Sequence, residues 1–474
     1  MKKFECTGFW WIPEREDYSV AGTLHVSNDG ELRLSLIGLI GSEETFSGKN
    51  RQIVLGSVDN SPSGTAVTLT GCFLTSTSAF SATGSREDYR ASRAYFGAHL
   101  KVDGDFRFQS FLLKLGGLSA WAHTLSGLHR EAAPLPTSKY RGQTVPLATY
   151  RVPNPLSGRL TDATITLNMG VSSKSEAEKF TFREQANFFV ELDETHSVDQ
   201  IEAKYVYPLR NLLTFAADAP QNVDSFVAWR TENQSDTSGN PEIRVVFPRV
   251  HPDAEGKKAE IVRKNEMLFT LADVDLVPFI EKWLRLSDIY SGAFTIFFGI
   301  QYGPPSYIDM TYTLLVQVLA LYYANTKQGL EQREEEERRL KSAISVISAQ
   351  DAEWIVDHIG VRPYPTFKTL LRRLIEQYGV TLDPILSKRR DAFVNQAIST
   401  LQYIERRNPE GKIAASHGSE LYWLIQKIKF LIKTCILAES GFSPNKINDI
   451  LLNNTLFQHL RELETEREKK QSPP

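Results

Sequence analysis

Several residue groups have types that could do chemistry, but their spacing excludes the commonest catalytic sites. The segment from Gly41 to Asn50 contains two glycines followed by Lys49, as a phosphate-binding loop does. Six residues rather than four separate those glycines, and Asn50 stands where such a loop has Ser or Thr for magnesium. The sequence contains no HExxH pair and no GxSxG serine elbow. It therefore predicts neither a P-loop nucleoside triphosphatase, nor a zinc protease with an HExxH motif, nor a serine hydrolase with a GxSxG elbow.

The cysteines and histidines do not form a recognisable site either. Cys6, Cys72 and Cys435 are far apart and show no CxxC spacing, so the sequence predicts no disulfide framework, no metal site and no cofactor. The nine histidines are scattered along the chain. Arg93 and His99 lie six residues apart, a spacing that arises often by chance. The cysteine usage is typical of a reducing cytoplasm.

Composition limits the possible partners. The 474 residues carry a formal net charge of −3, with 41% hydrophobic and 23% charged residues. This balance is typical of a soluble globular protein of two or three domains. No global positive field would hold nucleic acid, so any RNA contact must come from a local basic patch. The N-terminus lacks an apolar targeting region and no run is long enough to span a membrane, so we expect a cytoplasmic protein without membrane contact.

Strand patterns dominate the first part of the chain. Leu32, Leu34 and Leu36 alternate with polar residues, which is the period of a half-buried strand. Further short strands are expected at Ile53–Leu55, Ala66–Leu69, Phe106–Leu113, Thr164–Leu167, Phe188–Leu192, Phe226–Trp229 and Ile243–Phe247. Many short strands with frequent turn signals favour a sandwich or a barrel-like sheet. Ser197 and Gln200 have capping-box spacing and predict one helix start within this region.

Helical patterns dominate the second part of the chain. A helix is expected from about Asp275, and Tyr312–Ala324 is apolar nearly all round, as a central bundle helix would be. The mixed charges of Glu331–Lys341 predict a solvated helix. Apolar residues recur at helical spacing through Glu420–Glu439, and a last helix is expected over Pro444–Arg467. We therefore predict an α+β multidomain protein, with a β-rich region at 1–300 (possible break near 195–220) and an all-α helical bundle at 305–474.

Two stretches resemble a known family. The run Gly8-Phe9-Trp10-Trp11-Ile12-Pro13, then Val20–Leu24 and Leu34–Gly41, resembles the N-terminal domain of ApeA-type anti-phage proteins. The C-terminal third resembles the HEPN domain that follows it in that family, through Phe393-Val394-Asn395, Gly418-Ser419-Glu420-Leu421 and the Leu437–Phe442 ending. The resemblance implies an abortive-infection ribonuclease whose HEPN homodimer, or higher oligomer, cleaves cellular tRNA or rRNA. It also implies a phage-derived trigger for the N-terminal region.

HEPN chemistry uses an Arg and a His four to six residues apart and needs no metal. The Arg stabilises charge on the scissile phosphate, and the His transfers the proton of the 2′-hydroxyl or of the leaving group. Aligned on the family motif, these two positions fall on Ala397 and Gln402, with Ile398 at the intervening polar position. Neither Ala nor Gln can perform those roles. The sequence therefore predicts weak or absent cleavage, whether the motif was lost naturally or by alteration.

The nearest substitutes lie beyond the aligned motif. Arg407 and His417 are ten residues apart across the Pro409-Glu410-Gly411 break, which is longer than the motif allows. Arg406, Arg407 and Lys412 could instead contact RNA phosphates.

Two alternatives remain open from the sequence. One is a non-catalytic scaffold that recognises a ligand and dimerises. The other is a carbohydrate- or peptide-binding module built on Trp10 and Trp11, although core packing would explain those two residues equally well.

Overall fold

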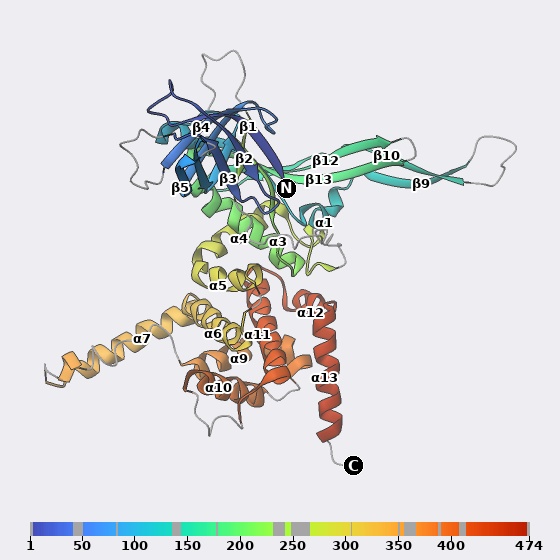
Figure 1. The fold of residues 1–474 in the computed structure, drawn as a ribbon. Helices are drawn as coiled ribbons and strands as arrows, with labels where there is room; N and C mark the ends of the chain where they lie inside the picture. The colour runs from blue at the N-terminus through green and yellow to red at the C-terminus, as the bar shows by residue number, and fades with distance from the viewer. Residues whose placement is uncertain are drawn as a thin grey trace. The chain divides into compact units, whose positions relative to one another are not determined.

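The structure is a computed structural model that describes most of the chain and divides into two compact units. The described residues are 3–40, 51–81, 84–134, 144–176, 179–230, 242–247, 266–304, 306–348, 351–354, 366–386, 390–406 and 414–471. The units are residues 1–281 and 282–474. The first is rich in strands and the second is helical, so the fold class predicted from the sequence is confirmed (Figure 1).

Thirteen strands of the first unit form one continuous sheet, in the order β11-β12-β13-β8-β14-β15-β7-β5-β4-β1-β2-β3-β6. Their bounds are β1 Phe4–Trp11, β2 Val20–Val26, β3 Leu32–Ile37, β4 Arg51–Val58, β5 Ala66–Ser81, β6 Gly84–Ala91, β7 Arg93–Phe96, β8 Arg107–Leu115, β11 Leu156–Arg159, β12 Ala163–Glu176, β13 Lys179–Ser197, β14 Val223–Trp229 and β15 Ile243–Val246. A separate pair contains β9 Leu128–Pro134 and β10 Thr144–Tyr150. Each strand expected from alternation overlaps one of these elements, but Phe106 belongs to the 3₁₀ turn before β8 and Phe247 lies just past the end of β15.

Six strands close into a barrel, because β5 pairs with β6 as well as with β4. β5 changes partner at Gly71: residues before it pair with β7, and residues after it pair with β6. Gly71 has φ 61°, and a Cβ there would lie 2.5 Å from the Ser92 hydroxyl oxygen. Glycine is therefore the residue that allows this strand to bend and close the barrel.

The barrel interior is packed with apolar side chains. Trp10 is fully buried among them, and a Cβ on Gly56 would lie 2.5 Å from its ring. Core packing is therefore the correct interpretation of Trp10. Trp11 is half-buried, with its ring edge-on to His99 at 5.2 Å. These positions remove the paired aromatic surface on which the carbohydrate-binding alternative depended.

The seven strands of the sheet outside the barrel have their own core on one face. They are β11, β12, β13, β8, β14, β15 and β7. Phe111 of β8 contacts Phe226 of β14 and Tyr205, which lies in a π-helical turn, Glu202–Val206. That turn stands between α2 Val198–Ile201 and α3 Tyr207–Ala217, and α1 is Leu118–Trp121. The predicted capping box is confirmed, because Ser197 and Gln200 exchange side-chain and backbone hydrogen bonds. The sheet continues past this helical segment, so 195–220 does not separate two sheets.

The second unit is a helical bundle. The described part of this unit includes the helices α4 Leu276–Ile289 (which begins in the first unit), α5 Ser291–Tyr302, α6 Ile308–Ala324, α7 Lys327–Ile344, α9 Phe367–Leu386, α10 Arg390–Arg406, α11 Gly418–Glu439, α12 Pro444–Leu452 and α13 Thr455–Gln471. α11 is the most deeply buried, and it packs against α6, α9 and α12. α5 packs on α6, so the helical unit begins earlier than the 300–305 boundary expected from the sequence.

One expected helix is two helices. The sequence predicted a single helix over Pro444–Arg467, but α12 ends at Leu452 and α13 begins at Thr455. Asn454 causes the break, because its side-chain oxygen accepts hydrogen bonds from the backbone of Leu456 and Phe457, both at 3.1 Å. This is N-cap geometry, which starts a new helix. Among the helices that the structure describes, none has the length and apolarity required to cross a membrane.

Candidate functional site

The aligned motif lies where α10 meets the segment that leads into α11. Gln396 of α10 donates to the Ser416 hydroxyl at 2.8 Å, and the Ser416 backbone donates to the Thr400 hydroxyl at 3.0 Å. Thr400 and Ser416 are both buried. These two hydrogen bonds fix the entry of α11 against α10, and we call this junction the α10–α11 corner.

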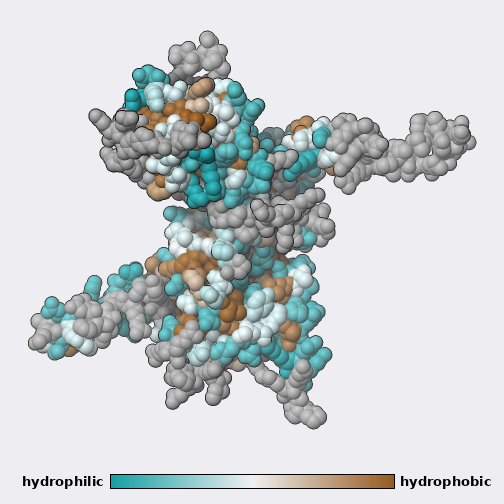
Figure 2. Space-filling view, viewed as in Figure 1, coloured by the Kyte–Doolittle hydropathy of each residue, from teal (hydrophilic) through white to brown (hydrophobic). Residues whose placement is uncertain are grey.

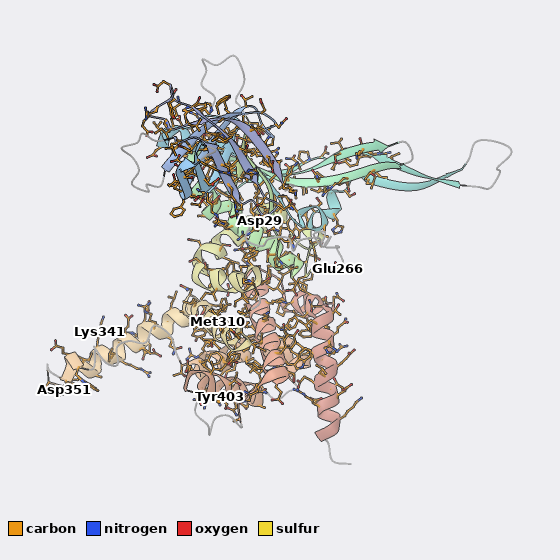
Figure 3. The ribbon with its side chains drawn as sticks, viewed as in Figure 1. Asp29, Glu266, Met310, Lys341, Asp351 and Tyr403 are labelled. Carbon is orange, nitrogen blue, oxygen red and sulfur yellow. The ribbon has the colours of Figure 1, made fainter. Side chains whose placement is uncertain are left out.

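His417 lies at this corner, directly before α11. It is the N-cap residue of α11, with extended backbone, and its side chain is exposed. The ring meets Tyr403 of α10 edge-on, with centroids 4.8 Å apart and planes at 89° (Figure 3 labels Tyr403). The corner thus places an exposed imidazole against the ring of Tyr403. The corner therefore offers one group of the kind that RNA cleavage requires.

Ala397 and Gln402 do not share a surface of α10. Ala397 is fully buried, and its backbone carbonyl accepts a 2.6 Å hydrogen bond from the Tyr312 hydroxyl of α6. Burial raises the pKa of Tyr312, so this hydroxyl stays protonated and donates. Gln402 is exposed. Five residues along an α-helix amount to a rotation of about 500°, so the two side chains point about 140° apart.

The basic residues of the corner are only partly described. Arg406 ends α10, whereas Arg407 and Lys412 lie outside the described residues. The structure therefore gives a place in the fold to Arg406 and His417 among the proposed substitutes and RNA contacts.

Sequence reasoning missed Gln396, Thr400, Tyr403 and Ser416. The first three recur at steps of four and three residues, which is the spacing of one helix face. That polar and aromatic stripe was the available signal for them. Ser416 had no such signal, because its contact depends on how the chain returns from α10 to α11.

A groove elsewhere in the helical unit has the wrong charge for RNA. It has a volume of about 760 Å³ and lies between α7 and α9. Arg373 is held in it by the Tyr323 hydroxyl and Gln332 Oε1, both at 2.5 Å. The charged residues of its lining are four glutamates and two arginines: Glu331, Glu335, Glu336, Glu376, Arg339 and Arg373. This excess of carboxylates disfavours a polyanion.

Arg93 and His99 of the first unit have separate partners. Arg93 pairs with Asp199 and with buried Glu202, both at 2.6 Å. His99 Nε2 lies 2.9 Å from the Gly56 carbonyl oxygen. Each side chain thus has a local structural contact, and the pair does not form one site. In the part of the chain that the structure describes, no three His, Cys, Asp or Glu side chains come together as metal ligands would.

Comparison with known proteins identifies both parts of the chain. Residues 5–283 match the family model of ApeA N-terminal domain 1, and residues 313–446 match that of the Apea-like HEPN domain. The α10–α11 corner lies within the second match. No curated protein and no solved structure matches the chain.

Proposed function

The chain belongs to the ApeA N-terminal domain 1 family, and from this premise we propose that it is an anti-phage defence effector whose HEPN unit acts on cytoplasmic RNA. The main support for this proposal is the order of the two domains, because the ApeA N-terminal domain is followed by the HEPN domain. HEPN domains typically act on RNA and often pair. The β-rich unit then receives a phage-derived signal, and the helical unit carries the response.

The RNA meets the helical unit at the α10–α11 corner. His417 and Tyr403 provide an exposed imidazole and an aromatic ring, and a base can stack on such a ring. Arg406 ends α10, and Arg407 and Lys412 follow it in sequence; these three residues supply the positive charge that backbone phosphates require. The alternative groove between α7 and α9 is too acidic for this role.

Cleavage by this chain is weak or absent. Ala397 has no charge and Gln402 does not titrate, so the charge stabiliser and the proton carrier of the aligned motif are both missing. Each role contributes about 10²–10⁴-fold to such a reaction. Losing either one brings a slow nuclease near the background rate.

RNA binding tests the proposal first. The purified chain should retain a labelled RNA in a filter or anisotropy assay, with affinity that falls as salt rises. Arg406→Gln with Arg407→Gln should weaken binding and lower the salt slope by roughly one for each phosphate that these arginines no longer neutralise. Arg461→Gln on α13 is the matched control, because Arg461 is an exposed arginine of the same unit. Equal RNA binding by all variants would remove the corner from the proposal.

A denaturing RNA gel tests the chemistry. We expect no cleavage above background from the unaltered chain. If fragments with cyclic-phosphate ends appear and persist in EDTA, Arg407 and His417 become the catalytic pair. His417→Ala should then abolish cleavage, whereas His459→Ala should not. His459 is the matched control, because it is also exposed and its ring also contacts an aromatic ring, Trp423 at 5.3 Å.

A non-catalytic scaffold is the second candidate function. The burial of Ala397 favours it, because an arginine could not occupy that position without displacing the packing around it. In this case the chain neither binds nor cleaves RNA but still dimerises and captures its trigger. Absence of RNA binding together with co-purification of a phage protein would establish this alternative.

A further inference from the structure

The first unit contains a pocket of about 290 Å³ on the side of the sheet opposite its core. The register shows which side this is: Ser225 of β14 pairs with Lys114 of β8, whereas the next pair, Phe226 and Leu113, is buried. Because side chains alternate across a strand, the polar residues share the other face. The pocket is lined there by Lys114, Gln185, Ser225 and Arg244, with Gly30 from the β2–β3 turn.

The pocket contains two cations that lack a carboxylate partner among the described residues. Lys114 Nζ is 3.5 Å from the Gln185 side-chain oxygen, which is a long and neutral contact. Arg244 Nε is buried, and no acceptor lies within hydrogen-bond distance of it in the described chain. Asp224, the acidic residue of the lining, is engaged in a polar interaction. A buried donor without an acceptor is unfavourable, so an anion entering here would gain a ready partner.

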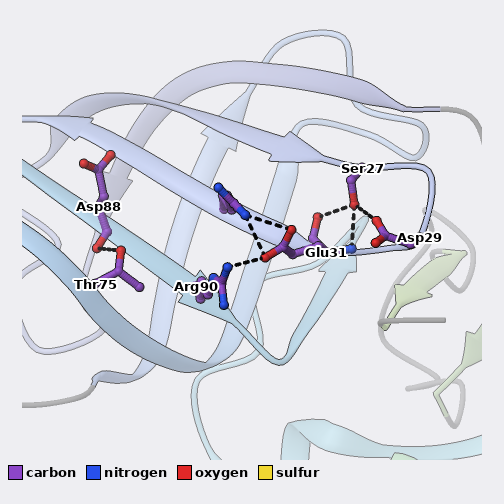
Figure 4. A network of polar contacts seen from close by, with 7 residues as sticks. Ser27, Asp29, Glu31, Thr75, Asp88 and Arg90 are labelled. Atoms are coloured by element: carbon purple, nitrogen blue, oxygen red, sulfur yellow. Dashed lines mark hydrogen bonds and ion pairs between the residues drawn. The ribbon is translucent and has the colours of Figure 1, made fainter. Parts of the chain in front are cut away.

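The wall formed by the β2–β3 turn is held by hydrogen bonds within the turn itself. The Ser27 hydroxyl donates to the Asp29 carboxylate and accepts from the Glu31 backbone at 2.8 Å (Figure 4). The Gly30 backbone donates to the Ser27 carbonyl at 3.1 Å, and Gly30 has φ 80°, which suits glycine. A pocket wall that is already ordered loses little entropy on binding.

We propose that this pocket binds the phosphate group of a small molecule, such as a nucleoside monophosphate. The planar guanidinium of Arg244 can donate two parallel hydrogen bonds to two oxygens of one phosphate, and the ammonium of Lys114 adds a positive charge beside it. The volume lies just below the roughly 300–1,000 Å³ of typical small-molecule sites, which suits a small ligand. The proposal is independent of RNA cleavage, because it concerns another unit and is tested by binding.

Calorimetric titration of the full chain tests it, with AMP and inorganic phosphate as probes and adenosine as the uncharged control. We expect saturable 1:1 binding of AMP that weakens as salt rises. Binding of AMP but not of free phosphate would show that the organic part also contributes. Arg244→Gln should weaken binding about tenfold or more. Arg151→Gln removes an exposed arginine of the same unit and should leave the affinity unchanged.

Three results would overturn the proposal: no saturable binding of either phosphate probe to the unaltered chain, unchanged affinity in Arg244→Gln, or equal binding of adenosine and AMP. If Arg244→Gln does not fold, Lys114→Gln takes its place and should weaken binding severalfold. Thermal unfolding of each variant establishes that it is folded before titration. RNA binding by the same variants should be unaffected, which separates this proposal from the proposed function.

Discussion

At the residue scale, the role expected for position 397 from the sequence disagrees with the burial of Ala397 in the fold. The family resemblance predicts a catalytic arginine at this place, but the Ala397 side chain is fully buried and its backbone carbonyl accepts a hydrogen bond from Tyr312. We expect Ala397→Arg to lower the free energy of unfolding by about 3 kcal/mol or more, because it overpacks the bundle and buries an unpaired charge. Urea denaturation measures this effect. Gln402→Arg, on the exposed side of α10, should change stability by at most about 0.5 kcal/mol.

If Ala397→Arg proved as stable as the unaltered chain, the arginine side chain would have to reach solvent. The α10–α11 corner could then accept the aligned motif with little rearrangement, and the scaffold interpretation would lose its main support. The sequence alone could not give this result, because Ala is compatible with both a buried and an exposed helix face.

A buried ion pair links α11 to α13. Lys427 Nζ donates to Glu464 Oε1 at 2.7 Å, and both side chains are nearly excluded from solvent. Burial lowers the pKa of Lys427, although Glu464 opposes this effect. Glu464→Ala should therefore cost about 3–5 kcal/mol, because it leaves a buried charge unpaired. The double replacement Lys427→Met with Glu464→Leu should recover most of that loss in the same urea titration.

The matched control for this pair lies on α7. Glu335 pairs with Arg338 and Arg339, both at 2.8 Å, but these side chains are exposed. Glu335→Ala should cost less than about 1 kcal/mol. Equal losses at Glu335 and Glu464 would contradict the burial that distinguishes the two pairs.

At the element scale, Asp162 joins the turn before β12 to the π-helical turn. Burial opposes ionisation of Asp162, but hydrogen bonds from Lys204 and Tyr205 outweigh it and hold the pKa below its ordinary value of 3.8. A carboxyl whose pKa is lower in the folded state stabilises the fold above its unfolded pKa, and this is lost as pH falls through the folded pKa. The stability difference between the unaltered chain and Asp162→Asn should therefore shrink below about pH 3.8.

Urea unfolding at a series of pH values from 7 to 2.5 measures that difference. Asp103→Asn is the control, because Asp103 is an exposed aspartate of the same unit. A difference that stays constant across the series would mean that the contacts of Asp162 with Lys204 and Tyr205 do not depend on its charge.

Local sequence patterns predicted most helices and strands, but they did not predict which strands pair or which helices contact each other. The alternation of Leu32, Leu34 and Leu36 marks β3 because burial on one face of a strand leaves a period of two in sequence. The pairing of β8 between β13 and β14 leaves no comparable trace, since it joins residues far apart along the chain. The candidate site divides in the same way. α11 was predicted as a helix from its apolar spacing, but the contact that Ser416, just before it, makes with α10 was not.

The difference in burial between α7 and α11 predicts that the two helices differ in their resistance to proteases. The residues of α11 from Ile425 to Cys435 are buried or partly buried. Arg338 and Arg339 of α7 are largely exposed. α7 extends away from the other helices of its unit (Figure 1). We expect brief trypsin treatment to cut first in Glu331–Arg339 or in Asn408–Ala415, of which 408–413 lie outside the described residues. Mass spectrometry of the fragments tests this, and a first cut within Ile425–Cys435 would contradict the bundle.

At the scale of the whole molecule, the two units each have a core, and the helical unit also has apolar residues on its surface. Exposed examples are Tyr307, Met310, Val380 and Tyr422. Hydrophobic patches are visible over α5, α6 and α11 in Figure 2. Soluble proteins seldom expose large contiguous apolar surface, and such patches often mark interfaces. Because HEPN domains often pair, a second copy of this chain is the partner we propose for this surface.

The full chain should therefore be a dimer at micromolar concentration by light scattering coupled to size exclusion. The full chain is the right sample, since cutting at residue 305 would remove α5 from α6 and expose their shared core. Tyr422 lies on the first turns of α11, five residues after His417 in sequence, and is 43% exposed. Tyr422→Glu would bury a carboxylate in an apolar contact at a cost of about 2–5 kcal/mol. This corresponds to a rise in the dimer dissociation constant of about thirtyfold or more.

Ile37→Glu provides the comparison, because Ile37 is an exposed apolar residue of β3 in the other unit. It should leave the dimer intact. A monomeric unaltered chain would remove pairing from the proposed function, and with it any site shared between two copies of the α10–α11 corner. A dimer that survives Tyr422→Glu but dissociates with Met310→Glu would instead move the interface to the start of α6. The corner would then face solvent in the dimer, and each copy would have to bind RNA with its own residues alone.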